Sequence, residues 1–179
     1  MTVCEVDISK DIPVTGLTTS FMNSIAEAAI VCFDDQNHDS GVTLRIEGEL
    51  NESIIFQWST EVSFQIKDTW NDLQEATEYG ATYLAVLIIH YFTPLKVIKR
   101  SRKRTGFDYW LGEKEDENYP FQEKSRLEIS GILQENKRNS VDKRVKEKLN
   151  QTKQSDNLNL PAYIVVVGFH QPQAQVAKK

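Results

Sequence analysis

The chain has 179 residues, of which 40% are hydrophobic and 26% are charged. This composition is ordinary for a folded protein and excludes the collagen-like and wholly disordered classes. The length suits one well-packed domain and is short for two, so we expect a single domain over residues 1–179.

The net charge of −5 conceals a division between the two halves of the chain. Residues 1–92 carry 15 acidic and 3 basic side chains, whereas residues 93–179 carry 11 acidic and 18 basic ones. The Lys/Arg cluster of residues 96–104 indicates an anionic partner, of which nucleic acid is the commonest kind. The alternative is that the two halves neutralise each other in the fold. The acidic half is a candidate surface for a homodimer contact or a protein partner.

The sequence favours a soluble, cytoplasmic protein. Cys4 and Cys32 are the only cysteines, too few for a disulfide framework. The N-terminus has no basic segment followed by an apolar stretch, so it shows no signal peptide. The most apolar run, residues 81–92, is shorter than the roughly 20 residues that a bilayer span needs, so we expect no membrane segment.

The first third of the chain predicts a helix followed by a hairpin. Apolar residues recur every three or four positions over residues 17–36, which predicts a helix that residues 37–41 close. Residues 42–48 and 54–58 read as two strands joined by a hairpin connection. We therefore expect residues 1–66 to form an acidic helix-and-hairpin extension.

The next segment predicts a long helix. Residues 68–91 show a helical apolar stripe, with Glu75 and Glu78 three positions apart on an adjacent face. Residues 84–92 are apolar on all sides and also fit a buried strand, which periodicity alone does not exclude, but we favour the helix. Pro94 ends this element.

Three strand-like runs follow, and two of them contain a carboxylate. Residues 95–102 read as a strand that leads into the runs of residues 105–112 and 126–132. Side chains alternate between the faces of a strand, so Asp108 points away from its apolar neighbours, and Glu128 does the same in the next run. If these runs pair, the two carboxylates converge on one point and can hold a hard divalent cation through oxygen ligands.

The chain ends with a helix, a strand and a tail. Asn139 or Ser140 can cap a helix whose apolar stripe continues to Leu149. Residues 162–169 form a continuous apolar run of the kind found in central strands. We expect the tail, residues 171–179, to be frayed or to form an edge strand.

This order of elements resembles the core of the PD-(D/E)XK nuclease superfamily, which has the restriction-endonuclease-like fold. The resemblance covers residues 68–170 and rests on a Gly-Phe-Asp start at Asp108, a Glu-Ile-Ser run at Glu128, and acids on the preceding helix. We therefore expect an α/β (α+β) fold, a central mixed sheet flanked by helices in the order α-β-β-β-α-β. The nuclease-like core would span residues 67–170.

The resemblance implies a Mg²⁺- or Mn²⁺-dependent nuclease that acts on DNA, in a bacterial defence or repair system. Asp108 and Glu128 would be the metal ligands, and the carbonyl of Ile129 would complete the shell. An acid on the first core helix would assist, either Glu78 or, as the second choice, Glu75. A cation suits this chemistry because it neutralises phosphate charge and generates hydroxide near neutral pH.

The sequence departs from the family pattern at one position. The family has a lysine two residues after the glutamate, where it supports the attacking water, and this chain has Ser130. Arg144, Lys148 and Gln151 lie along one side of the following helix and can supply the missing group. We choose Lys148. If none of the three reaches the metal, the fold persists without the chemistry.

The residues expected to bind DNA lie in the Lys/Arg cluster and on the last helix. They are Lys99, Arg100, Arg102, Lys103, Arg104 and Arg144. Each carboxylate also has an ordinary explanation, since Asp108 can cap a turn and Glu128 can face solvent beside Arg126. The rival function is a catalytically inactive protein that keeps this fold and binds nucleic acid or another protein.

Overall fold

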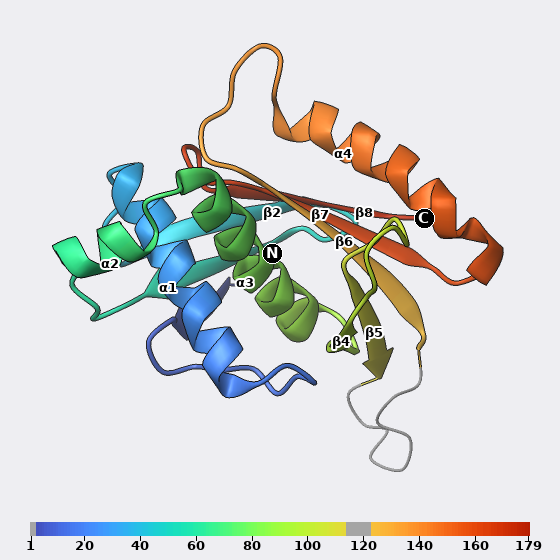
Figure 1. Cartoon of the computed structure of the whole chain (residues 1–179), viewed down its shortest axis with the longest axis horizontal. Coiled ribbons are helices and arrows are strands. Elements are labelled where there is room, and N and C mark those ends of the chain that lie inside the picture. The colour runs from blue at the N-terminus through green and yellow to red at the C-terminus, as the bar shows by residue number, and fades with distance from the viewer. Residues whose placement is uncertain (1–2, 114–122) are drawn as a thin grey trace.

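The computed structural model describes residues 3–113 and 123–179 (Figure 1). In these two ranges the chain forms eight strands, four α-helices and one 3₁₀ helix. In chain order they are β1 (Val3–Asp7), α1 (Thr19–Asp35), β2 (Val42–Gly48), β3 (Glu52–Gln57), α2 (Phe64–Thr69), α3 (Leu73–Phe92), β4 (Leu95–Arg100), β5 (Tyr109–Glu113), β6 (Ser125–Ile132), α4 (Val141–Gln151), η1 (Thr152–Leu158), β7 (Ala162–Gly168) and β8 (Gln173–Lys178).

The eight described strands belong to one mixed sheet in the order β1-β3-β2-β8-β7-β6-β5-β4. The pairs β1 with β3, β2 with β8, and β6 with β7 are parallel, and the other neighbours are antiparallel. Helices α1 and α3 cover one face of the sheet and α4 covers the other (Figure 1). The expected α/β architecture, a central mixed sheet flanked by helices, is confirmed.

Strand β7 shows how the two faces are filled. Val165 and Val167 belong to the larger core, beneath α1 and α3, whereas Ile164 and Val166 belong to the smaller core, beneath α4. A strand covered by helices on both faces buries every side chain, so its sequence is continuously apolar instead of alternating. This explains why the run was readable as a central strand.

Helix α3 is apolar all round because it lies between α1 and the sheet. Residues 81–89 are buried on every side of the helix, which settles the choice between helix and strand. The Asp72 carboxylate caps the helix by accepting hydrogen bonds from two backbone amides of the first turn, and the helix ends at Phe92, before Pro94. No helix in the described ranges has the length and hydropathy needed to cross a membrane.

The C-terminal tail is a central strand, so our expectation of a frayed or edge segment at residues 171–179 is wrong. Strand β8 pairs with β2 on one side and with β7 on the other. Ala174 and Val176 are buried between these neighbours. Small side chains alternating with glutamine give a weak apolar signal, and long-range pairing decides the position of the strand. Residues 1–66 therefore join the core through β8 in one continuous sheet.

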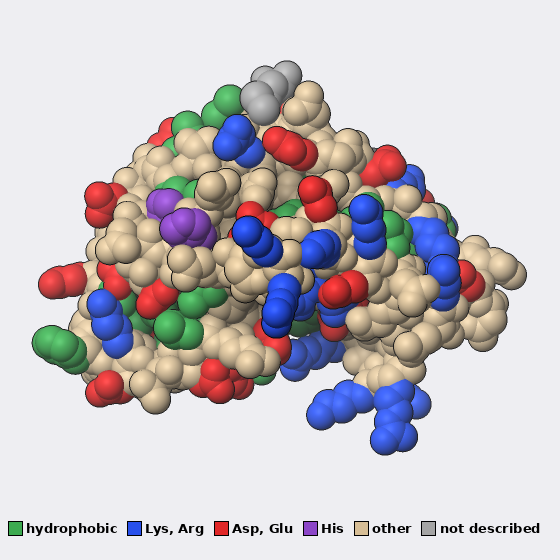
Figure 2. Space-filling model, turned by 90° about the horizontal axis from the view of Figure 1, so that it is seen from above, with side chains coloured by type: hydrophobic (Ala, Val, Ile, Leu, Met, Phe, Trp, Pro, Cys, Tyr) green, Lys and Arg blue, Asp and Glu red, His purple; other side chains and the backbone are tan. Residues whose placement is uncertain are grey.

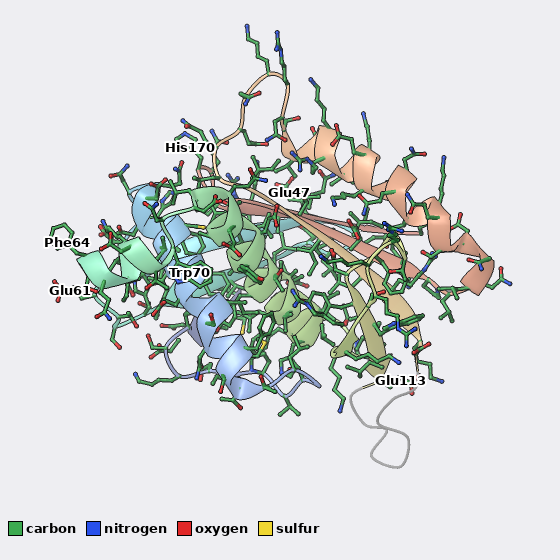
Figure 3. All side chains as sticks on the ribbon, in the orientation of Figure 1. Glu47, Glu61, Phe64, Trp70, Glu113 and His170 are labelled. Atoms are coloured by element: carbon green, nitrogen blue, oxygen red, sulfur yellow. The ribbon has the colours of Figure 1, made fainter. Side chains whose placement is uncertain are left out.

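Three short elements have no counterpart in the sequence analysis: β1, α2 and η1. They span too few residues for a periodic pattern to stand out. Phe64, at the start of α2, points away from the molecule and is 88% exposed (Figure 3). Trp70, which follows α2, lies against α1, where its Nε1 donates to a carboxylate oxygen of Glu27 at 2.8 Å. Helix α2 thus docks on α1 through its C-terminal end.

Strand β6 and helix α3 approach each other closely at Gly131. A Cβ atom at this position would lie 2.5 Å from the carbonyl oxygen of Thr77 and 2.7 Å from the Thr77 Cγ2 atom. Only a residue without a side chain allows this approach. The contact holds α3 beside the end of β6 that follows Glu128.

We expect Gly131→Ala to lower the free energy of unfolding by about 1–3 kcal/mol, because overpacking forces packed neighbours to shift. Gly168→Ala is the matched control, since a Cβ atom there would lie 3.4 Å from its nearest neighbour, an ordinary contact. Urea denaturation followed by circular dichroism measures both variants. Equal stability of the two variants would contradict the close approach of α3 and β6.

Candidate active site

The antiparallel strands β5 and β6 bring Asp108 beside Glu128. Tyr109 faces Leu127 in the register, so the next residues outward, Asp108 and Glu128, are neighbours across the two strands. The Asp108 amide donates to the carbonyl of Leu127 at 2.8 Å. The Ile129 amide donates to Asp108 Oδ2, also at 2.8 Å. Asp108 is therefore attached to β6 through both its backbone and its carboxylate.

Helix α4 supplies the hydrogen-bond donors for Glu128. Lys148 Nζ donates to Glu128 Oε1 at 2.6 Å, and Gln151 Nε2 donates to the same oxygen at 2.9 Å. Lys148 Nζ also donates to Gln151 Oε1 at 3.2 Å. Val141 and Val145 bury the inner side of α4 in the smaller core. Lys148 follows them at helical spacing, which turns it toward the sheet.

Glu128 is a buried carboxylate with an incomplete set of partners. The residue is 1% exposed, and its Oε2 atom has no hydrogen-bond partner in the described part of the chain. Burial, followed by the charge of Asp108, raises the pKa of Glu128 to about 7, although Lys148 opposes the shift. Burial among protein atoms also raises the pKa of Asp108, although solvent reaches this residue and the Ile129 amide opposes the shift. The pair therefore binds a proton more readily than two separate carboxylates would.

A cleft of about 880 Å³ lies next to this pair. Its walls are α3, the loop of residues 101–107, and α4. Figure 2, seen from the α4 side, shows Lys and Arg side chains gathered on the half of the surface that α4 occupies. Cations outnumber acids along the described lining, so the cleft attracts anions. The cations are Arg100, Arg102, Lys103, Arg104, Arg144 and Lys148, and the acids are Glu75, Glu78 and Asp108.

The cleft brings together most of the residues that the sequence singled out. Glu128 itself is not among the lining residues, but it contacts Lys148 and Gln151, which are. The expected residues that line the cleft are Glu75, Glu78, Arg100, Arg102, Lys103, Arg104, Asp108, Ile129, Arg144, Lys148 and Gln151.

Lys99 is the expected DNA contact that the fold places elsewhere. Its ammonium pairs with the Glu123 carboxylate and lies 5.7 Å from the centre of the Trp110 ring. The register of β4 shifts between Val97 and Lys99, which is the mark of a β-bulge. A bulge changes the direction of the side chains that follow it, and strand periodicity alone does not reveal it.

The alternative that Glu128 is an ordinary surface residue, exposed to solvent beside Arg126, is wrong. Both residues are buried. Arg126 donates to the carbonyls of Thr152 and Leu160 at 3.2 and 2.6 Å, and to Ser155 Oγ at 2.7 Å. Arg126 thus holds β6 against η1, the 3₁₀ helix that follows α4. The hydrogen bonds to Glu128 come instead from Lys148 and Gln151 of α4.

Position 130 holds a serine that is bonded to the last helix. Arg144 Nη1 donates to Ser130 Oγ at 3.2 Å, and Arg144 Nη2 donates to Asn139 Oδ1 at 2.6 Å. The guanidinium is therefore anchored at two points on the cleft wall. Position 130 thus offers a neutral hydroxyl that positions an arginine.

The β4–β5 loop carries cations that the acidic half of the chain could have neutralised. Arg102, Lys103 and Arg104 are exposed, and within the described residues they form no ion pair. The acidic half of the chain therefore does not neutralise this loop. Its charge remains available to an anion that enters the cleft.

The sequence did not single out several residues of the lining, among them Tyr79, Thr82, Tyr109 and Gln154. Tyr79 and Thr82 lie four and seven positions after Glu75 on one side of α3, so helical spacing from Glu75 could have found them. Tyr109 carried only the signal of a core residue, and it is indeed buried. Gln154 lies in η1, for which the sequence gave no pattern.

The donor chemistry of the pair fits Mg²⁺. Mg²⁺ is commonly bound through one or two carboxylates and keeps several waters, whereas zinc sites use three or four protein ligands, chiefly Cys and His. No cluster of three or more His, Cys, Asp or Glu residues in the described ranges is placed to hold a metal. Asp108 and the unpartnered Oε2 of Glu128 are the oxygens on offer, so water would fill most of the shell.

Comparison with protein-family models, with curated proteins and with solved structures found no match. The residues and the geometry of the cleft are therefore what indicates a function.

The Glu128 carboxyl makes the stability of the fold depend on pH. Its folded-state pKa of about 7 lies above the ordinary value of 4.5, so between these values the folded state binds more protons than the unfolded state. The free energy of unfolding then falls as the pH rises from about 4.5 to 7, and it stays low above that range. The raised pKa of Asp108 acts in the same direction.

Glutamine at position 128 cannot ionise. Over this pH range we therefore expect the free energy of unfolding of Glu128→Gln to fall by up to about 3 kcal/mol less than that of the parent. Urea unfolding of the variant and the parent at pH 4.5 and pH 8, without divalent metal, measures the difference. The parent should lose more stability over this interval than the variant. Identical pH dependence in the two proteins would contradict the burial and pairing of Glu128.

Proposed function

We propose that this protein is a metal-dependent nuclease with a restriction-endonuclease-like core, and that it hydrolyses phosphodiester bonds of DNA. The observation that carries the proposal is the meeting of Asp108, Glu128 and Lys148 beside a basic cleft. Two carboxylates for a cation, with an ammonium beside them, are a sufficient minimum for metal-assisted hydrolysis.

The chain order supports the family assignment. Elements α3, β4, β5, β6, α4 and β7 follow one another in the order α-β-β-β-α-β. Asp108 immediately precedes the second of these strands and Glu128 lies within the third, as in the family pattern. Glu78 on α3 lines the same cleft, where the family often has an assisting acid.

Asp108 and Glu128 would hold the Mg²⁺ ion, with the carbonyl of Ile129 as a further ligand by resemblance. When bound, the ion neutralises charge on the scissile phosphate and lowers the pKa of a bound water. Glu128 Oε2 has no donor in the described part of the chain, so it is free to accept a cation. Such a contact would offset part of the cost of burying this carboxylate.

Lys148 would take the role of the family lysine from a different element. Its ammonium contacts Glu128 Oε1 and is oriented by Gln151 Oε1. From there it can donate a hydrogen bond to an attacking water and stabilise negative charge as it develops on the phosphate. Ser130 carries no charge, so the role falls to the helix.

The basic walls of the cleft would hold the DNA backbone. Arg102, Lys103 and Arg104 on the β4–β5 loop, and Arg144 on α4, present charges to a phosphate chain. Contacts of this kind fix the position of the substrate without reading its sequence. We therefore expect binding that weakens as salt is added.

A catalytically inactive, nucleic-acid-binding role is the second candidate. It is favoured by Glu128 Oε1, which already accepts two hydrogen bonds from α4, and by Ser130 at the position of the family lysine. The same cleft would then bind DNA without cleaving it. The acidic N-terminal half would remain free for a protein partner or a second copy.

We expect the purified protein to cleave DNA in Mg²⁺ or Mn²⁺, with plasmid and single-stranded substrates tested side by side on gels. Asp108→Asn keeps the size of the side chain but removes a metal ligand, and Lys148→Met removes the ammonium. Each change should lower the cleavage rate by about 100-fold or more, in line with the loss of a transition-state charge contact. Circular dichroism checks that each variant is folded.

Lys146→Met is the matched control, because Lys146 lies on the same helix, is exposed and does not line the cleft. It should cleave at the parental rate. Equal cleavage by all four proteins would identify a contaminating nuclease. DNA binding without cleavage in either metal would favour the inactive role.

A further inference from the structure

Glu128 is recessed beneath three walls, and its partner Asp108 lines the cleft that they form and is exposed. The β4–β5 loop reaches across to the end of α4, where Gly106 (φ 81°) lies so close that a Cβ atom would be 2.9 Å from the carbonyl oxygen of Gln151 and 3.1 Å from Gln154 Cβ. Helix α3 forms the opposite wall. Glu128 is 1% exposed, so a phosphate must descend into the cleft to reach it.

The size of the cleft limits what can descend. Its volume of about 880 Å³ falls within the range of roughly 300–1,000 Å³ that encloses small molecules. A double helix is a stiff rod whose major groove alone is about 12 Å wide, so it cannot narrow to follow the walls of the cleft. A single strand is slender and flexible, so it can thread between the walls.

Arg100 is a preorganised cation in the lining. Its guanidinium lies 5.2 Å from the centre of the Phe21 ring and 5.9 Å from the centre of the Tyr109 ring. Within the described residues it forms no ion pair with a carboxylate. Aromatic rings hold the guanidinium in place without neutralising it, which leaves its charge for an anion.

Tyr79 is an aromatic residue of the cleft lining whose ring packs against neighbouring aromatic rings. It makes edge contacts with Phe21 and Trp70, with ring centres 6.2 and 5.8 Å apart. The ring is half-buried and lines the cleft next to Arg100. A rigid aromatic side chain beside a cationic groove is the combination that single-stranded DNA-binding sites use, because every base can stack on it.

We infer that the cleft takes a single strand of DNA in preference to an intact double helix, with Arg100 binding a backbone phosphate and Tyr79 stacking on a base. This inference rests on the proposed function and names its substrate form. The strand would pass between α3 and the β4–β5 loop, with one phosphate beside Asp108.

A binding experiment without metal separates this inference from catalysis. The probe is a fluorescent 20-nucleotide single strand, compared with the same strand in a blunt duplex, and anisotropy is recorded in EDTA. The single strand should bind at least about tenfold more tightly. Tyr79→Leu should weaken single-strand binding by about 5- to 100-fold, and Arg100→Gln should weaken it and reduce its salt dependence.

Two variants control for loss of structure. Tyr79→Phe keeps the ring and should bind within about twofold of the parent if stacking is the role of this residue. Tyr91→Leu makes the same change as Tyr79→Leu at an exposed tyrosine outside the cleft and should leave binding unchanged. Equal weakening by Tyr79→Leu and Tyr91→Leu would overturn the stacking role.

The outcomes also separate the inference from the nuclease proposal. Tight single-strand binding with no cleavage in Mg²⁺ or Mn²⁺ would support the inference and contradict the nuclease. Metal-dependent cleavage of duplex at least as fast as that of single strand would support the nuclease and overturn the inference. Duplex binding as tight as single-strand binding, or no binding of either probe, would also overturn it.

Discussion

The ion pair between Glu128 and Lys148 is the interaction on which the rest of the site depends. A buried carboxylate is costly unless it is paired and hydrogen-bonded. Lys148 Nζ at 2.6 Å and Gln151 Nε2 at 2.9 Å meet this need at one oxygen only. The contacts from α4 thus hold the Glu128 carboxylate in place. Asp108 adds a second acidic group, and Oε2 of Glu128 has no donor in the described part of the chain, so the two carboxylates have too little positive charge around them. That shortage is what a divalent cation would satisfy.

The acidic first half and the basic second half of the sequence occupy different parts of the fold, but they share one continuous sheet. Strands β1, β3 and β2, from the acidic half, lie at one end of the sheet, and β4 to β7 lie at the other (Figure 1). Strand β8 joins them, so the last residues of the chain hold the two regions together. The basic cleft belongs to the end formed by β4, β5 and β6, and α3 from the acidic half contributes one of its walls.

Much of the site was predictable because it depends on local periodicity. The alternation along two strands predicted that Asp108 and Glu128 could meet, and helical spacing placed Lys148 and Gln151 on one side of α4. The order of most elements followed from the same patterns, whereas the mixed sheet flanked by helices was what the family resemblance implied. These features depend only on the spacing of residues along the chain.

Other features depend on contacts between distant segments, and the sequence did not reveal them. Strand β8 has little apolar signal of its own, and its central position follows from pairing with β2 and β7. The bulge that diverts Lys99 and the close approach at Gly131 are properties of packed neighbours. The rings around Arg100 and Tyr79 likewise come from α1 and the segment after α2.

The most direct test of the central claim is to locate a bound cation. Crystals of the protein grown with Mn²⁺ would show it by anomalous scattering. We predict one peak within coordination distance of both Asp108 and Glu128, with Lys148 still beside it. A fully occupied peak elsewhere, or none at this pair at saturating Mn²⁺, would contradict the account.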